Sequence, residues 1–126
     1  MAELISAPTR IPVPGGKVIN EYVGRVTTGT EAVSVAHMVA PGGWSEPAQQ
    51  PDFDEVTVVL RGTVLVEVAD GDGGTSTLEV PAGQAVVTKA GERVRYATGD
   101  EETEYVAVCL PAFSPDNVNR DDEPGE

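Results

Sequence analysis

The chain consists of short runs rich in β-branched and aromatic residues, separated by glycines and prolines. Turn formers such as Thr28-Gly29-Thr30 and Asp70-Gly71-Asp72-Gly73-Gly74 divide the runs, so every strand must fold back soon after it begins. The expected strands are residues 17–27, 31–40, 56–60, 63–69, 75–80, 84–89, 93–98 and 104–110. Strands this short and numerous predict an all-β, antiparallel sandwich or barrel. Only Ser114, followed by Pro115, is typical of a helix start.

Length and charge limit the organisation and the partners. A chain of 126 residues predicts one domain, here divided into an N-terminal arm (1–16), a barrel (17–112) and a C-terminal tail (113–126). The single cysteine, Cys109, excludes a disulfide within the chain. The formal net charge of -13 predicts that the protein binds neither nucleic acid nor an anionic membrane. The N-terminal sequence has no long apolar run, so we expect a cytoplasmic protein.

The stretch from residue 43 to residue 62 contains the most informative chemistry. An acidic cluster, Asp52, Asp54 and Glu55, stands directly before the β-branched run 56–60, which ends at Gly62. That run has the composition of a buried strand. Because a carboxylate at the mouth of a buried strand is costly without a partner, Glu55 is the first candidate for a functional role.

The glycines around this stretch resemble a known pattern. Gly43, Glu55 and Gly62 have the spacing of the first cupin motif, and Gly83 and Gly91 with the strand 94–98 fit the second. The chain therefore resembles the cupin superfamily over residues 30 to 111. The resemblance implies a single-domain cupin jelly-roll β-barrel, in agreement with the strand count.

The sequence departs from the cupin pattern at the metal ligands. Where the resemblance implies three histidines, this chain has Gln49, Pro51 and Val94, and only the carboxylate of Glu55 is kept. Proline and valine side chains cannot ligate a metal, and a neutral amide is a poor ligand for a transition metal. We therefore expect no metal and no cofactor. Cupins of the ethanolamine-utilisation group, which the segment 54–62 resembles more weakly, also lack these histidines.

Strand parity predicts what faces the barrel interior. If Val94 takes the inward position of the missing ligand, Tyr96 and Thr98 also point inward, because side chains alternate along a strand. The same rule places Gln49, Pro51 and Glu55 inside. These residues form a predicted pocket with apolar walls and a few polar groups, which is typical of a ligand site. Trp44 and Phe53 flank the motif as rim or substrate-binding residues.

His37 is the only histidine. It shares a strand face with Val33, Val35 and Val39, the bulkier set, which predicts that this face points to the core. There it is either a hydrogen-bonded core residue or, if it reaches the pocket, a second acid-base group.

Three functional classes fit these residues, and the sequence does not decide whether the chain is an enzyme. The first is a metal-independent cupin acting on a small organic molecule by proton transfer, as an isomerase, cyclase, dehydratase or lyase, with Glu55 and His37 catalytic and Gln49 and Tyr96 binding an oxyanion. The second is a non-catalytic cupin that binds a small molecule or a partner. The third keeps a hard divalent ion on Glu55, Asp52 and Gln49, with His37 as a further candidate ligand. In every case we expect a small-molecule ligand in the barrel and a homodimer that covers exposed strand edges.

Overall fold

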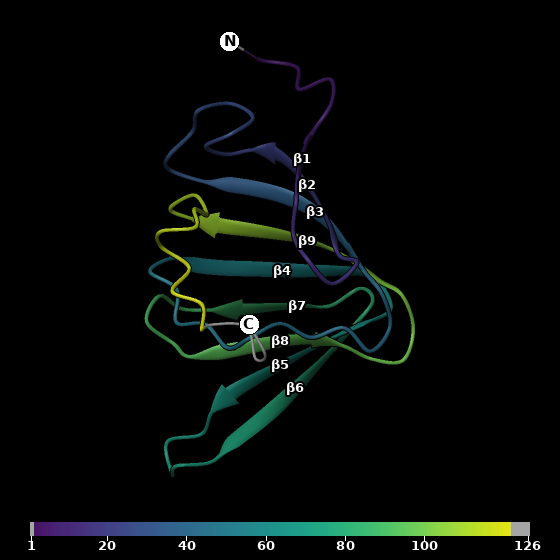
Figure 1. Cartoon of the computed structure of the whole chain (residues 1–126), viewed down its shortest axis with the longest axis vertical. Helices are drawn as coiled ribbons and strands as arrows, with labels where there is room; N and C mark the ends of the chain where they lie inside the picture. Colours follow the sequence, from purple (N-terminus) through teal and green to yellow (C-terminus); the bar gives the residue numbers. More distant parts are fainter. Residues whose placement is uncertain (1, 122–126) are drawn as a thin grey trace.

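Two antiparallel sheets face each other in the computed structural model, which describes residues 2–121 (Figure 1). The strands are β1 (Thr9–Ile11), β2 (Val18–Val23), β3 (Ser34–Ala40), β4 (Asp54–Arg61), β5 (Thr63–Ala69), β6 (Thr75–Pro81), β7 (Ala85–Thr88), β8 (Val94–Thr98) and β9 (Thr103–Leu110). The larger sheet has the order β1-β2-β3-β9-β4-β7, and the smaller has the order β6-β5-β8. This is a cupin-like jelly roll, which confirms the predicted all-β antiparallel fold.

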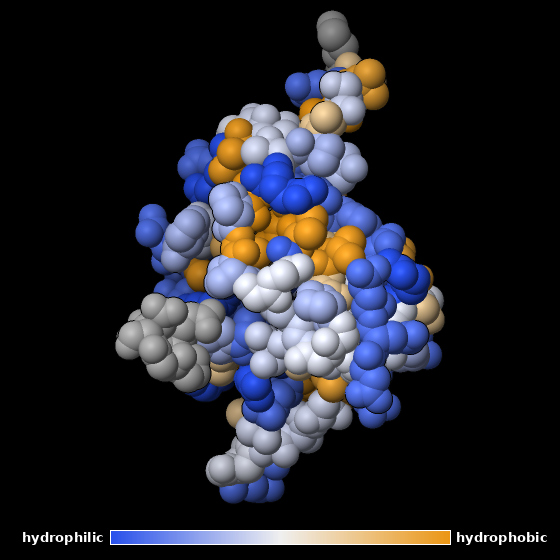
Figure 2. All heavy atoms as spheres, turned by 45° about the vertical axis from the view of Figure 1, so that its right-hand side comes forward, coloured by the Kyte–Doolittle hydropathy of each residue, from blue (hydrophilic) through white to orange (hydrophobic). Residues whose placement is uncertain are grey.

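The core lies between the two sheets. Val59, Tyr105 and Ala107 from the larger sheet pack against Val64, Val66, Val80, Val94 and Tyr96 from the smaller one, with Ala40 and Trp44 completing the cluster. The alternating burial of β9, in which every second side chain from Thr103 to Cys109 is buried, follows from the two-residue period of a strand. Figure 2 shows apolar side chains gathered in the middle of one face, with hydrophilic residues around them.

The turn at Gly62 carries the chain from one sheet to the other. Gly62 joins β4 of the larger sheet to β5 of the smaller one, and its φ of 78° lies in the left-handed region. A Cβ at this position would overlap the Thr103 side chain and approach the Glu102 carbonyl oxygen to 2.7 Å. Both the backbone conformation and the close approach therefore require glycine here.

Two segments differ from the sequence-based expectation. The helix start expected at Ser114 is wrong: Ser114 begins a single turn in which its carbonyl accepts from the Asn117 amide at 3.2 Å, and no helix occurs among residues 2–121. The Asn117 side chain donates to the Ala112 carbonyl at 3.0 Å, which holds the turn against the barrel. Before the barrel, β1 adds to β2 through the pairs Thr9↔Glu21 and Ile11↔Ile19. Among the described residues there is no helix long and apolar enough to cross a membrane.

Candidate functional site

A cavity of about 440 Å³ lies on the concave side of the larger sheet. Its walls come from β2, β3, β4, β8 and β9, from residues 11–17 before β2, and from two irregular segments, 44–53 and 113–120. Apolar side chains such as Met38, Phe53 and Phe113 form most of the lining. Its size lies in the range of pockets that take small organic ligands.

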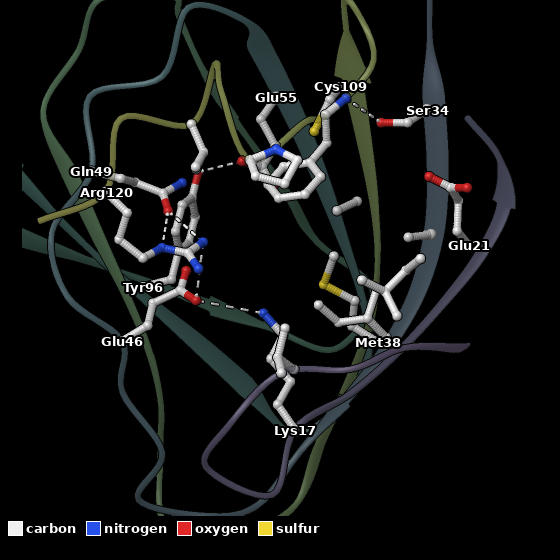
Figure 3. A pocket seen from close by; sticks show the side chains of 18 of the residues that line it. Lys17, Glu21, Ser34, Met38, Glu46, Gln49, Glu55, Tyr96, Cys109 and Arg120 are labelled. Atoms are coloured by element: carbon white, nitrogen blue, oxygen red, sulfur yellow. Dashed lines mark hydrogen bonds and ion pairs between the residues drawn. The ribbon is translucent and has the colours of Figure 1, made fainter. Parts of the chain in front are cut away.

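Glu55 is one of two buried carboxyl groups that line this cavity; the other, Glu21, accepts hydrogen bonds from the Thr27 amide and hydroxyl. Glu55 stands near the start of β4, where pairing with Thr88 of β7 and Cys109 of β9 fixes its inward direction. The Tyr96 hydroxyl donates to Glu55 Oε1 at 3.3 Å and also lies 3.0 Å from the Thr88 hydroxyl (Figure 3). Burial raises the pKa of Glu55 to about 7, although Lys17 acts in the opposite direction. Near neutral pH the group is therefore poised between its charged and neutral forms.

A polar network forms another wall of the cavity. Arg120 donates from Nε and Nη2 to Gln49 Oε1 at 3.1 and 2.8 Å, and its Nη2 lies 3.4 Å from Glu46 Oε2. Lys17 Nζ approaches the same Glu46 oxygen to 3.8 Å. Figure 3 shows Arg120, Gln49 and Glu46 grouped on one side, with Lys17 extending toward them from another wall. Burial lowers the pKa of Lys17, while the carboxylates of Glu46 and Glu55 act to raise it.

The loop segments are positioned by backbone bonds. Gln49 exchanges two amide-carbonyl bonds with Val94 of β8, at 2.8 and 2.9 Å, which extends the smaller sheet by a short bridge. The Asp121 amide donates to the Ala48 carbonyl at 2.8 Å, and Asp121 also pairs with Arg93. Residues 113–121 are thereby held across the cavity, and 122–126 lie outside the described residues.

Five of the residues predicted for the site line the cavity: Glu55, Gln49, Tyr96, Trp44 and Phe53. Three others are buried away from its lining. Val94 belongs to the core cluster, and Pro51 is buried beside the Gly91 amide, which donates to its carbonyl at 2.8 Å. The Thr98 hydroxyl donates to the Pro41 carbonyl at 2.7 Å and accepts from the Trp44 amide at 3.0 Å, so it supports the loop that carries Trp44.

His37 does not reach the cavity. The inward face of β3 is formed by Ser34, Ala36 and Met38, and His37 lies on the opposite face with its Nε2 3.0 Å from Glu104 Oε1. The placement of the valine face toward the core is therefore wrong: the inner face of β3 borders the open cavity, so it does not need the bulkier side chains of the strand to fill a packed core. A second acid-base role for His37 beside Glu55 has no geometric basis.

The residues at the cupin ligand positions do not fit a transition metal. Pro51 and Val94 offer no donor, and the Gln49 amide oxygen already accepts two bonds from Arg120. Asp52 is exposed outside the cavity, so the set of Glu55, Asp52 and Gln49 is not assembled. Among residues 2–121, no group of three or more His, Cys, Asp and Glu side chains could hold a metal ion.

Sequence reasoning missed Lys17, Glu46 and Arg120. All three are charged residues on irregular segments, where strand parity says nothing about direction. The available signal was weak: Lys17 follows two glycines, and Glu46 precedes a proline. Glu46 and Arg120 lie together in the cavity although more than 70 residues separate them in the sequence.

Comparison with known proteins adds the following. No family model matches the chain. A protein of Myxococcus xanthus named Endoribonuclease YbeY is 45% identical over 107 residues, which are 84% of this chain but 35% of that protein. The chain thus spans about a third of the length of this curated relative. Structures of oxalate decarboxylase from Bacillus subtilis are similar with TM-scores of 0.77 and 0.75 at 18% identity, covering 92% and 90% of this chain and 31% and 30% of theirs.

These comparisons support the cupin-like fold and contradict the predicted function. The solved structures are too distant in sequence to show more than the fold. The curated relative is named for endoribonuclease activity, which is not among the predicted classes. The prediction of a metal-independent isomerase, cyclase, dehydratase or lyase is therefore overturned by this relative.

Proposed function

We propose that this chain acts in RNA processing as an accessory cupin module, of the kind matched within the longer endoribonuclease. The proposal rests on the match to that relative, which is 45% identical to this chain over 107 residues. The matched residues are only 35% of the relative's length. The remaining length of the relative has no counterpart in the match and offers a separate place for an RNA-cleaving centre. A cytoplasmic location is part of this proposal.

The charge of the chain argues for an accessory role over direct RNA cleavage. A net charge of -13 opposes the approach of a phosphate backbone. Within the cavity, Arg120 is already bound to Gln49 and Glu46, which leaves it poorly placed to contact a phosphate. The largely apolar lining instead supports a small organic ligand, held in a cupin site without the usual metal-binding histidines.

An RNA cleavage assay separates the two roles. The purified chain, the Myxococcus protein and that protein lacking its aligned 107 residues are each incubated with a fluorogenic RNA oligonucleotide. We expect no cleavage by this chain and retained cleavage by the shortened relative. Cleavage by this chain alone, abolished by Glu55→Gln, would overturn the accessory role and place the ribonuclease centre in the barrel.

A homodimer through the outer face of the larger sheet is a second proposal. Residues that alternate with the cavity-facing ones are apolar there: Val56 pairs with Val108 and Val87, and Val58 pairs with Val106. Val58, Leu60 and Val87 are 37%, 50% and 55% exposed, where a solvent-facing sheet surface would carry polar residues. We expect light scattering at micromolar concentration to give twice the chain mass, and Val58→Lys to give the monomer. A monomeric wild type would refute the proposal.

A further inference from the structure

The Lys17 ammonium group opens on the cavity and makes no hydrogen bond with the residues that the structure describes. Its side chain is 7% exposed, and the nearest carboxylate oxygen, on Glu46, is 3.8 Å from Nζ, which is too long for a hydrogen bond. The ammonium instead lies 4.4 Å from the Trp44 ring centroid and 5.4 Å from that of Tyr105. These rings attract a cation but accept no strong hydrogen bond, so the three N–H donors of Lys17 have no acceptor among the described residues.

The charge around Lys17 is also incompletely balanced. Glu46 is shared between Lys17 at 3.8 Å and Arg120 at 3.4 Å, so one carboxylate faces two cations. Glu55, which faces the same space in Figure 3, is uncharged in much of its population near neutral pH because burial raises its pKa to about 7. A buried charge without hydrogen bonds or a full counter-charge is costly, and a bound anion would supply both.

We propose that the cavity binds an amphipathic organic monoanion, with its carboxylate on Lys17 Nζ and its apolar body against Met38, Phe53 and Phe113. The proposal rests on the ligand-binding role given above and names the ligand class. The carboxylate accepts from the free donors of Lys17. The unbonded Lys17 ammonium favours a ligand with one negative group, and the apolar lining favours a hydrocarbon or aromatic body.

The test uses three probes that share one apolar body: octanoate, octylammonium and 1-octanol. Trp44 is the only tryptophan and lines the cavity beside Lys17, so its fluorescence reports occupancy. Uridine monophosphate serves as a fourth probe for a phosphate source of the anion. We expect octanoate to bind at least about tenfold more tightly than octanol, in line with a charge-assisted hydrogen bond worth about 1.5 to 3 kcal/mol. Octylammonium should bind more weakly than both.

Substitutions at the two lysines test whether Lys17 causes the preference for octanoate over octanol. Lys17→Met should remove the preference for octanoate over octanol, and Lys17→Arg should keep part of it. Lys89→Met, at the only other lysine, which is exposed, should leave it unchanged. Retained octanol binding shows that the Lys17 variant is folded with an intact cavity.

The outcomes that contradict this inference differ from those that contradict the ligand-binding role. Equal or tighter binding of octylammonium, or an octanoate preference that survives Lys17→Met, overturns the monoanion assignment while leaving a ligand site. Tighter binding of uridine monophosphate than of octanoate overturns the apolar carboxylate in favour of a nucleotide. Failure of every probe to bind refutes the ligand-binding role itself.

Discussion

Replacing Glu55 by glutamine should change the pH dependence of stability. The Glu55 carboxyl has a pKa of about 7 in the folded protein against 4.5 for an ordinary glutamate, and desolvation by burial is the main cause. A group whose folded pKa is raised binds its proton more tightly in the folded state, so its contribution to stability is complete below pH 4.5 and is lost as the pH rises through 7. The difference in pKa corresponds to about 3 kcal/mol.

Glutamine keeps the shape and can still accept from the Tyr96 hydroxyl, which lies 3.3 Å from the carboxylate oxygen. At pH 5, where Glu55 is largely protonated when folded, the two proteins should be nearly equal in stability. At pH 8 the wild type carries the cost of a buried charge, and Glu55→Gln should be more stable by up to about 3 kcal/mol. The attraction between Glu55 and Lys17 is already contained in this figure, because the pKa of about 7 is the net result of burial and of that attraction.

Urea unfolding followed by Trp44 fluorescence at pH 5 and pH 8 measures the effect. At each pH the free energy of unfolding of the variant is compared with that of the wild type. The titration of the other carboxylates is the same in both proteins and cancels in this difference. Glu79→Gln on β6, at an exposed site, controls for the change of net charge. A variant that is destabilised at pH 8 and recovers at pH 5 would refute the reasoning, since it would mean that Glu55 is ionised and stabilised by its partners.

Three further predictions follow from buried groups. The Thr57 hydroxyl is buried without a hydrogen-bond partner, so Thr57→Val should stabilise the protein by about 1 kcal/mol in urea unfolding. Thr103→Val is the control and should destabilise the protein, because the Thr103 hydroxyl bonds the Thr63 amide and two carbonyls. An unchanged or lower stability of Thr57→Val would contradict this. Gly62→Ala should lower stability by more than the roughly 1 to 2 kcal/mol expected for left-handed backbone strain alone, because its Cβ also clashes with neighbouring atoms. Gly83→Ala measures the strain by itself, since no atom lies within 4 Å of its Cβ position. Equal losses in the two variants would contradict the predicted clash. Burial raises the pKa of the Cys109 thiol, so its reaction with a disulfide reagent should be slow in the native protein and fast in urea, and a fast native reaction would show that the cavity admits the reagent to a thiolate.

Much of the fold could be predicted because its signals are local. Turn glycines such as Gly43, Gly62 and Gly91 all have positive φ, a conformation that other residues rarely adopt, so their spacing marks the turns of the barrel. Strand parity correctly placed Val94, Tyr96 and Thr98 inside. Both inferences use information that lies within a few residues of each position.

The candidate site was only partly predictable because it depends on contacts between distant segments. Gln49, Glu55 and Tyr96 lie on segments whose direction follows from strand pairing, and all three line the cavity. Lys17 and Arg120 enter it from irregular segments at the two ends of the chain. For His37, the bulkier face of the strand was taken as the inner one, but the inner face of β3 borders the cavity and carries Ser34, Ala36 and Met38. Local hydrophobicity does not show whether a strand face borders a packed core or a cavity.

Apolar residues such as Trp44, Tyr96 and Tyr105 belong to the core and also line the cavity, whereas the charged residues of the cavity lie outside both core clusters, and this bears on the function. Positive-φ glycines and the valine core maintain a TM-score of 0.77 to oxalate decarboxylase at 18% identity, so the architecture persists while most side chains change. The cavity chemistry here depends on Lys17, Glu46 and Arg120, which no turn or core position requires. Substitutions at these three positions therefore change the charged groups of the cavity without altering a strand or a turn glycine. For the same reason, neither fold similarity nor a match to a third of a longer relative determines the ligand, and the unbonded Lys17 ammonium is the more direct guide to what the cavity binds.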